Sequence, residues 1–254
     1  MADPKPIIEV KDVTAAYGEV VVLQDISFDV YPGEVFVILG GSGCGKSTLL
    51  KQMIGLVTPV KGSVFIDGDD IVTAEGRQRV AILRKIGVMY QSGALFGSMS
   101  LMDNIGLVLD EFTNLPREAR ELIALMKLKV VGLEKAAHKM PAELSGGMRK
   151  RAAIARAMAL DPKVLFLDEP SAGLDPVASA RMDDLILQLS QTLGMTFVIV
   201  THELPSIFAI TDRSILLDRE TKTIVARGKP EELRQNQKNP WIYQFFNRQA
   251  SATV

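Results

Sequence analysis

A glycine-rich segment between an apolar run and a helical pattern constrains this chain more than any other feature. The segment 40-GGSGCGKST-48 matches the pattern G-x-x-x-x-G-K-[ST], follows the apolar run 35-VFVIL-39 and opens the helical pattern 46-KSTLLKQMIGL-56. Glycines let the backbone wrap a phosphate chain, the helix N-terminus favours negative charge, and the lysine reaches the terminal phosphates. The strand-loop-helix context therefore predicts a nucleotide-binding α/β core.

The whole loop is expected to contact the nucleotide. The predicted ligands are Gly40, Gly41, Ser42, Gly43, Cys44, Gly45, Lys46, Ser47 and Thr48. Ser47 would also offer its hydroxyl to Mg²⁺. Cys44 is the single cysteine, which excludes an internal disulfide. It occupies a variable position of the pattern, where a space-filling role and redox control are the alternatives.

Two adjacent carboxylates follow another apolar strand, 164-VLFLDEP-170. Asp168 would hold Mg²⁺. Glu169 would act as a general base, or orient the water that attacks the γ-phosphate. Such a pair also occurs in ordinary turns, but its presence together with a phosphate loop favours the catalytic interpretation.

Three further polar side chains are candidates because of where they stand. His202 ends the strand pattern 196-TFVIVTH-202, at the edge where open α/β sheets bind ligands, and is expected to contact the γ-phosphate. Gln91 follows 86-IGVMY-90 and could reach Mg²⁺ or the attacking water. Tyr17 could stack on a base, although a strand tyrosine is also a common packing residue.

Hydrophobic patterning predicts the fold class. The segments 7–17 and 20–30 indicate antiparallel strands, whereas continuous Val/Ile/Leu/Phe runs elsewhere are typical of parallel strands buried on both faces. Residues from about 98 to 160 show helical periodicity without a convincing strand, with Pro116 placed to start a helix. We therefore expect one domain over residues 1–254: an α/β mixed-sheet core, an N-terminal antiparallel β subdomain, an inserted helical subdomain at about 98–160 and a tail at about 230–254.

Composition narrows the possible partners. A net charge of -1 lacks the basic excess of a nucleic-acid surface, so no nucleic acid is expected as a partner. No apolar run approaches the ~18 residues of a membrane span, and the N-terminus MADPKPIIEV lacks the pattern of a secretory signal. We expect a soluble chain that meets a membrane only through a partner.

A second glycine-containing segment, 144-LSGGMRKR-151, precedes a helical run. Ser145, Gly146 and Gly147 would place a hydroxyl and backbone N–H groups at a helix start, which makes another anion site. A nucleotide in the same chain already has its own cradle, so this site is expected to serve a different molecule. The basic run 149-RKR-151 is interpreted as a solvated helix face, with attraction of the facing nucleotide as the alternative.

These motifs together, in this order and spacing, resemble the ATP-binding domain of ABC transporters over essentially the whole chain. The resemblance implies a RecA-like P-loop NTPase core, ATP and Mg²⁺ as cofactors, and ATP hydrolysis coupled to transport. It implies that Tyr17 stacks on adenine, Gln91 lies in the loop that touches the transporter, and His202 is the switch histidine. Asp175, in 171-SAGLD-175, would link the two sites of a dimer in which each LSGG segment closes on the other copy's ATP. Met148 departs from the glutamine that is common after LSGG.

A narrower resemblance is to ATPases of MCE-type lipid transporters, such as the bacterial Mla system for maintenance of lipid asymmetry. It rests on 91-QSGALFGSMSLMDNI-105, on the Met148 variant, on 170-PSAGLDP-176 and on 239-NPWIYQFF-246. It implies two copies beneath an integral-membrane permease, on the cytoplasmic side of the inner membrane, driving phospholipid transport between inner and outer membrane. A periplasmic MCE lipid-binding protein and, in some systems, a small cytoplasmic accessory subunit would complete the assembly.

Two segments leave their partner open. The methionine-rich residues 89–102 would either seat a permease helix or pack the helical insertion. In the tail, Asn239 is a predicted helix N-cap and Pro240 the first helical residue. Trp241, Phe245 and Phe246 would then share a face that packs either on this chain or on a neighbouring subunit.

Three other functions compete with this one. A different ABC importer or exporter, acting on a non-lipid solute, is the main alternative. A soluble ABC ATPase acting on ribosomes or DNA typically carries two nucleotide-binding units or long coiled coils, and this chain has neither. A non-catalytic scaffold would not need Lys46, Asp168, Glu169 and His202 together.

Overall fold

The structure is a computed structural model that describes residues 5–248. The chain forms two compact units. The first contains the residues up to 72 and those from 198 onward, and the second contains residues 73–197. Within the described residues, no helix combines the length and the apolar character needed to cross a bilayer.

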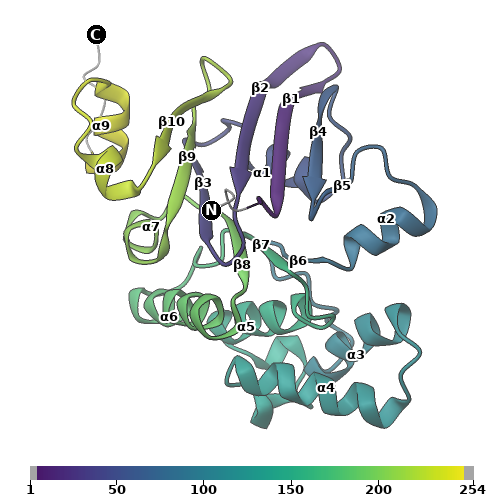
Figure 1. The fold of residues 1–254 in the computed structure, drawn as a ribbon. Coiled ribbons are helices and arrows are strands. Elements are labelled where there is room, and N and C mark those ends of the chain that lie inside the picture. The colour runs from purple at the N-terminus through teal and green to yellow at the C-terminus, as the bar shows by residue number, and fades with distance from the viewer. Residues whose placement is uncertain (1–4, 249–254) are drawn as a thin grey trace. The chain divides into compact units, whose positions relative to one another are not determined.

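The first unit contains a four-stranded sheet with the order β2-β1-β4-β5 (Figure 1). Its strands are β1 (Ile8–Tyr17), β2 (Val20–Val30), β4 (Lys61–Ile66) and β5 (Asp69–Asp70). β1 pairs antiparallel with both β2 and β4, which confirms the predicted antiparallel β-sheet. Tyr17 pairs with Val20, so the connection is a two-residue turn, and Gly18 adopts the positive φ of 58° that such a turn requires.

The first unit also contains the neighbouring strands β10-β9-β3-β8. They are β3 (Val35–Gly40), β8 (Thr196–Val200), β9 (Arg213–Leu217) and β10 (Ile224–Gly228), and β8 begins in the second unit. β3 runs parallel to β9, and both β3 and β8 are buried along their whole length. The helices are α1 (Lys46–Met53), α7 (Leu204–Ile210), α8 (Pro230–Arg234) and α9 (Pro240–Asn247). α1 ends three residues earlier than the predicted helix.

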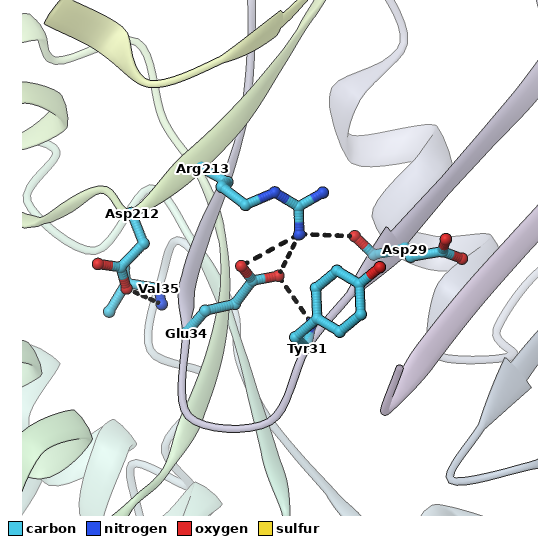
Figure 2. A network of polar contacts seen from close by, with 6 residues as sticks. All are labelled: Asp29, Tyr31, Glu34, Val35, Asp212 and Arg213. Atoms are coloured by element: carbon cyan, nitrogen blue, oxygen red, sulfur yellow. Dashed lines mark hydrogen bonds and ion pairs between the residues drawn. The ribbon is translucent and has the colours of Figure 1, made fainter. Parts of the chain in front are cut away.

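A polar network fixes the turn that leads into β3 (Figure 2). Arg213, at the start of β9, donates to both carboxylate oxygens of Glu34 at 3.0 and 3.2 Å and to the carbonyl oxygen of Asp29 at 3.4 Å. Glu34 also accepts from the backbone N–H of Tyr31 at 2.7 Å, and the guanidinium lies over the Tyr31 ring. The strand that carries the phosphate loop is thereby attached to its neighbour at its beginning.

The second unit combines two parallel strands with helices. β6 (Ile86–Met89) pairs with β7 (Val164–Asp168). The helices are α2 (Gly76–Leu83), α3 (Leu101–Phe112), α4 (Arg117–Val130), α5 (Gly146–Ala157) and α6 (Pro176–Leu193), with short 3-10 helices η1 (Glu134–Ala136) and η2 (Pro141–Glu143). Between β6 and β7 the chain forms only helices and loops, and α3 packs beside α4 (Figure 1). The predicted α/β fold class is therefore confirmed.

Gly87 of β6 allows a close approach to α5. A Cβ at this position would lie 2.2 Å from the carbonyl oxygen of Ala157, the last residue of α5. No other residue type fits without moving the helix. Strand β6, which leads to Gln91, is thus packed directly against α5, the helix that begins within the LSGG segment.

The tail helix α9 begins as predicted. The side chain of Asn239 accepts from the backbone N–H groups of Trp241 and Ile242, which makes it the N-cap. The predicted face of Trp241, Phe245 and Phe246 is wrong in one respect, because the residue buried together with Phe246 is Ile242. The ring centroid of Phe246 lies 6.1 Å from that of Phe208 on α7. Since residues four apart share a helix face, Ile242 pairs with Phe246 in packing on this chain.

Trp241 and Phe245 form the other pair on α9. Their ring centroids are 5.9 Å apart, and both side chains are only half-buried. The helix therefore packs on its own unit through one pair of residues, while a second aromatic pair remains accessible to a neighbour.

Candidate functional site

The phosphate loop joins β3 to α1 through a backbone that depends on glycine. Gly43 and Gly45 have φ values of 75° and 98°, in the left-handed region, and Gly45 is the N-cap of α1. A Cβ on Gly40 would lie 2.4 Å from the sulfur of Cys44 and 2.6 Å from the carbonyl oxygen of Leu217. The sequence therefore folds into the tight wrap that the motif predicts, with no room for larger residues at its start.

Lys46 points back into this loop. Its ammonium nitrogen donates to the carbonyl oxygens of Gly40 at 2.8 Å and Gly41 at 3.0 Å. The positive charge is thus held over the concave backbone that the motif assigns to phosphates. Cys44 is 2% exposed, and its burial raises the pKa of the thiol, so the side chain is a packed, protonated one. This observation supports the space-filling interpretation of Cys44.

Two other predicted residues belong to the first unit. Tyr17 is 52% exposed, and its hydroxyl lies 3.4 Å from the hydroxyl oxygen of Thr48, at the start of α1. Its ring is accessible and adjacent to the phosphate-loop helix. His202 follows β8, is exposed, and lines an open pocket of about 500 Å³ whose lining residues are His202, Glu203, Leu204, Pro205, Phe245 and Arg248. The switch-histidine candidate and the tail helix therefore border the same hollow.

The predicted carboxylates lie in the second unit. Asp168 is the last residue of β7 and is half-buried. Glu169 follows it, is 8% exposed, and has a φ of 50°. Gln91 lies just beyond the end of β6 and is exposed. Strands β6 and β7 are parallel neighbours, so both predicted groups leave the same edge of this strand pair.

The structure brings the LSGG segment and Asp175 together. Ser145 is the N-cap of α5, and its hydroxyl accepts from the backbone N–H of Met148 at 3.3 Å. Asp175 is the N-cap of α6 and accepts from the N–H groups of residues 177 and 178. Both helix starts border one pocket of about 190 Å³, lined by Ser145, Gly146, Gly147, Met148, Arg151, Gly173, Leu174, Asp175, Ala178, Arg181 and Met182.

Packing within the chain does not require glycine at positions 146 and 147 of this pocket. A Cβ on Gly146 would lie 3.6 Å from Leu174, and one on Gly147 would lie 3.7 Å from Ala178, both ordinary contact distances. The missing side chains instead leave the first turn of α5 open for a ligand to approach its backbone N–H groups. An anion supplied from outside the chain fits this geometry.

The sequence alone does not indicate the contacts that two residues on α5, Lys150 and Arg156, make in the structure. Lys150 is buried at 8% exposure, so the interpretation of 149-RKR-151 as a solvated face is wrong for its middle residue, although Arg149 is exposed. Arg156, also on α5, donates to the carbonyl oxygen of Ala94 and lies over the Phe96 ring at 5.4 Å. The helical repeat offered a signal, because Lys150 is four residues before the buried Ile154.

The methionine-rich segment forms one side of a groove on the helices α3 and α4. The groove has a volume of about 230 Å³ and is lined by Met99, Met102, Asp103, Gly106, Leu107, Asp110, Arg117, Arg120 and Glu121. Its apolar part comes mainly from methionines, and its charged residues carry both signs. Phe96 is 48% exposed in the same segment. The segment therefore packs on its own helices and also presents an accessible apolar surface.

Comparison with known proteins shows the family to which this chain is similar. The family model described as "ABC transporter" matches residues 23–172. The chain is 42% identical over 240 residues to the probable ribonucleotide transport ATP-binding protein mkl of Mycobacterium leprae, covering 94% of this chain and 68% of that protein. It is 39% identical over 248 residues to the intermembrane phospholipid transport system ATP-binding protein MlaF of Haemophilus influenzae, covering 98% of this chain and 93% of that one.

A solved structure gives the same result. A dimeric ATP-binding cassette in a post-hydrolysis state, bound to ADP and Pi, superposes with a TM-score of 0.79 at 31% identity, over 87% of this chain and 98% of that chain. This chain belongs to the ABC transporter family, as one of its ATP-binding and ATP-hydrolysing subunits.

Proposed function

We propose that this subunit drives phospholipid transport between the inner and outer membrane of a bacterium through an integral-membrane permease. One observation carries the proposal: the chain is 39% identical to MlaF over 98% of its own length and 93% of that protein. The LSGGM variant, the segment after Gln91 and the tail helix agree with this group. The proposed location is peripheral, on the cytoplasmic side of the inner membrane.

The chemistry assigned to the site is hydrolysis of the γ-phosphate of ATP. A water oxygen forms a bond to the γ-phosphorus, the bond to the bridging oxygen breaks, and ADP and inorganic phosphate result. Glu169 accepts the proton of this water, and Gln91 and His202 contact the water and the γ-phosphate. Lys46 and the loop N–H groups bind the phosphates, and the exposed Tyr17 ring stacks on adenine. Glu169 is buried, so its carboxylate is shielded from bulk water, which supports a role in orienting a single attacking water.

The residues assigned to Mg²⁺ have the right chemistry for it. Ser47, Gln91 and Asp168 supply hydroxyl, amide and carboxylate oxygens, which are the hard ligands that Mg²⁺ prefers in phosphate-bound sites. Among residues 5–248 there is no cluster of three or more His, Cys, Asp or Glu side chains fit to hold a metal by themselves. A site completed by phosphate oxygens agrees with that composition. When bound, Mg²⁺ neutralises charge on the phosphates.

The active form is proposed to be a head-to-tail dimer. The open first turn of α5 supports it, because Gly146 and Gly147 leave backbone N–H groups accessible to an anion from outside the chain. In the proposed dimer these groups and the Ser145 hydroxyl bind the γ-phosphate held by the partner's loop, and Asp175 links the two sites. ATP then holds the two copies together, and hydrolysis releases them.

The permease is proposed to dock on the groove of α3 and α4, where methionines adapt to an incoming helix and charges flank it. A periplasmic MCE lipid-binding protein and a small cytoplasmic accessory subunit are the further expected partners. The accessible Trp241–Phe245 pair on α9 is a candidate contact for a neighbouring subunit.

Purification of the N-terminally tagged chain from detergent-solubilised membranes of its native host tests the transport proposal. We expect a permease, an MCE-domain protein and bound phospholipid to co-purify. Recovery of a different permease with a solute-binding protein, and without phospholipid, would contradict the lipid assignment while leaving the ATPase intact. A non-lipid solute is the second candidate, because the mkl relative carries the name of a ribonucleotide transport protein.

A further inference from the structure

A buried lysine contacts the backbone of the proposed catalytic residue. Lys150 lies in the middle of α5 and is 8% exposed. A buried ammonium group needs strong hydrogen-bond partners because it has lost its water. Its nitrogen donates to the carbonyl oxygen of Glu169 at 2.7 Å, a charge-assisted and therefore strong hydrogen bond. Helix α5 thus holds the peptide group of Glu169.

The backbone of Glu169 is in a conformation that must be held. Its φ of 50° lies in the left-handed region, which residues other than glycine enter only where the surrounding structure imposes it. The same carbonyl oxygen also accepts from the N–H of Ala172 at 3.2 Å. Lys150 and this tight turn together fix the peptide group that follows Glu169. They thereby fix the direction in which the Glu169 side chain extends from the backbone.

The same helix carries the LSGG anion site. Gly146 and Gly147 form the first turn of α5, and Lys150 follows one turn later. Four residues correspond to about 6 Å along a helix axis, so both features belong to one rigid segment. A displacement of the first turn therefore displaces the ammonium group that holds Glu169.

We propose that Lys150 is a positioning residue for Glu169, through which the anion bound at the start of α5 sets the orientation of the catalytic carboxylate. The proposal rests on the proposed function, in which Glu169 is the base and the LSGG segment binds a phosphate. The LSGG anion site then has a role beyond holding two copies together, because its occupancy aligns the catalytic base Glu169 in the same chain.

Steady-state ATPase kinetics of the full-length chain test the proposal. Lys150→Met keeps the aliphatic stem and removes the donor, Lys150→Arg keeps a cationic donor, and Lys129→Met makes the same change at an exposed lysine on α4. We expect Lys150→Met to lower kcat by about tenfold to a hundredfold, the size of effect that a misplaced catalytic group produces, with the KM for ATP within about twofold. Lys150→Arg should recover part of the turnover, and Lys129→Met should match the unaltered chain.

A double variant separates positioning from folding. If Lys150 acts through Glu169, then adding Lys150→Met to Glu169→Gln lowers the residual hydrolysis no further. A Lys150→Met chain with unchanged kcat would overturn the proposal. So would a loss of turnover accompanied by equal losses of ATP affinity and thermal stability, which indicates a structural role. Full turnover in Glu169→Gln alone would instead contradict the proposed role of Glu169, whatever Lys150 does.

Discussion

The ammonium nitrogen of Lys46 lies 2.8 Å from the carbonyl oxygen of Gly40, at the start of its own phosphate loop. A second hydrogen bond, of 3.0 Å, reaches Gly41. The lysine that the motif assigns to the phosphates therefore also stabilises the loop before any nucleotide binds. Its removal should affect both the nucleotide-free protein and the complex, and the two effects can be measured separately.

Lys46→Met should lower ATP affinity by about tenfold to a hundredfold, because a hydrogen bond to a charged group is worth about 1.5–3 kcal/mol. The free energy of unfolding of the nucleotide-free chain should fall by about 1 kcal/mol, since two loop carbonyls lose their donor. Lys51→Met, at an exposed lysine on the same helix, is the matched control and should change neither quantity. Calorimetric titration and denaturant unfolding measure the two effects, and unaltered ATP affinity in Lys46→Met would refute the assignment.

Gly147→Ala should separate folding from dimer formation. The added Cβ meets only Ala178 at 3.7 Å, so the nucleotide-free chain should be unchanged or more stable by up to about 1 kcal/mol. In the Glu169→Gln background, the same methyl group should weaken the ATP-dependent dimer by about tenfold, or ~1.4 kcal/mol, because it obstructs the approach of the phosphate. Thermal unfolding and light scattering measure the two effects. A dimer of undiminished affinity would show that the first turn of α5 is not the contact.

Asn104 controls the methionine-rich segment after Gln91. It is fully buried, its amide donates to the carbonyl oxygens of Phe96, Met99 and Ser100, and its side-chain oxygen accepts from the Phe96 N–H. Asn104→Asp keeps the shape but places an acceptor against three carbonyls. The free energy of unfolding should fall by about 3 kcal/mol, the cost of buried groups left without donors.

Hydrogen exchange provides the local readout for this change. Protection should be lost first over residues 92–100, while α6 keeps its protection. Asn114→Asp, at an exposed asparagine in the loop before α4, should leave both stability and exchange unchanged. Equal loss of protection throughout the second unit would contradict a local role for Asn104.

The Glu34–Arg213 network predicts a pH dependence of stability. Burial raises the pKa of Glu34 above its ordinary value of 4.5, and the opposing effects of Tyr31 N–H and Arg213 do not cancel it. The folded chain therefore holds this proton more tightly than the unfolded chain does. The stability contributed by the protonated carboxyl is complete below pH 4.5 and is lost as the pH rises through the raised folded-state pKa. Denaturant unfolding from pH 4 upward should show this decline, and Glu34→Gln should flatten it; an identical slope in the variant would contradict the assignment.

Local sequence signals were sufficient where one short segment determines the structure. The phosphate loop, the antiparallel hairpin around Gly18 and the Asn239 cap all follow from residue types at fixed offsets. The positions of the predicted catalytic groups at strand ends also follow, because an apolar strand that ends in a polar residue places that residue at the sheet edge.

The remaining features depend on contacts between distant parts of the chain. Arg213 contacts Glu34 across 179 positions of sequence, and the residues around either one do not indicate this pairing. Lys150 looks like a member of an exposed basic run until α5 packs against the Glu169 turn. On α9, the sequence pattern indicates a face of three aromatic residues, but the aliphatic Ile242 is buried together with Phe246. In each case a partner distant in sequence decides which face of an element is buried.

Complementation of two inactive chains is the most direct test of ATP bound between two copies. Ser145→Arg alters only the LSGG cradle, and Lys46→Met alters only the phosphate loop, so each chain alone should have little ATPase activity. In a mixed dimer, the intact loop of the first chain faces the intact LSGG segment of the second. We predict that mixing restores hydrolysis at one site per mixed dimer, with a kcat below that of the unaltered chain, because the Ser145→Arg cradle cannot help to align Glu169 of its own chain. If both cradles served one nucleotide within a single chain, every site would carry a defect and the mixture would stay inactive, which would contradict the proposed dimer.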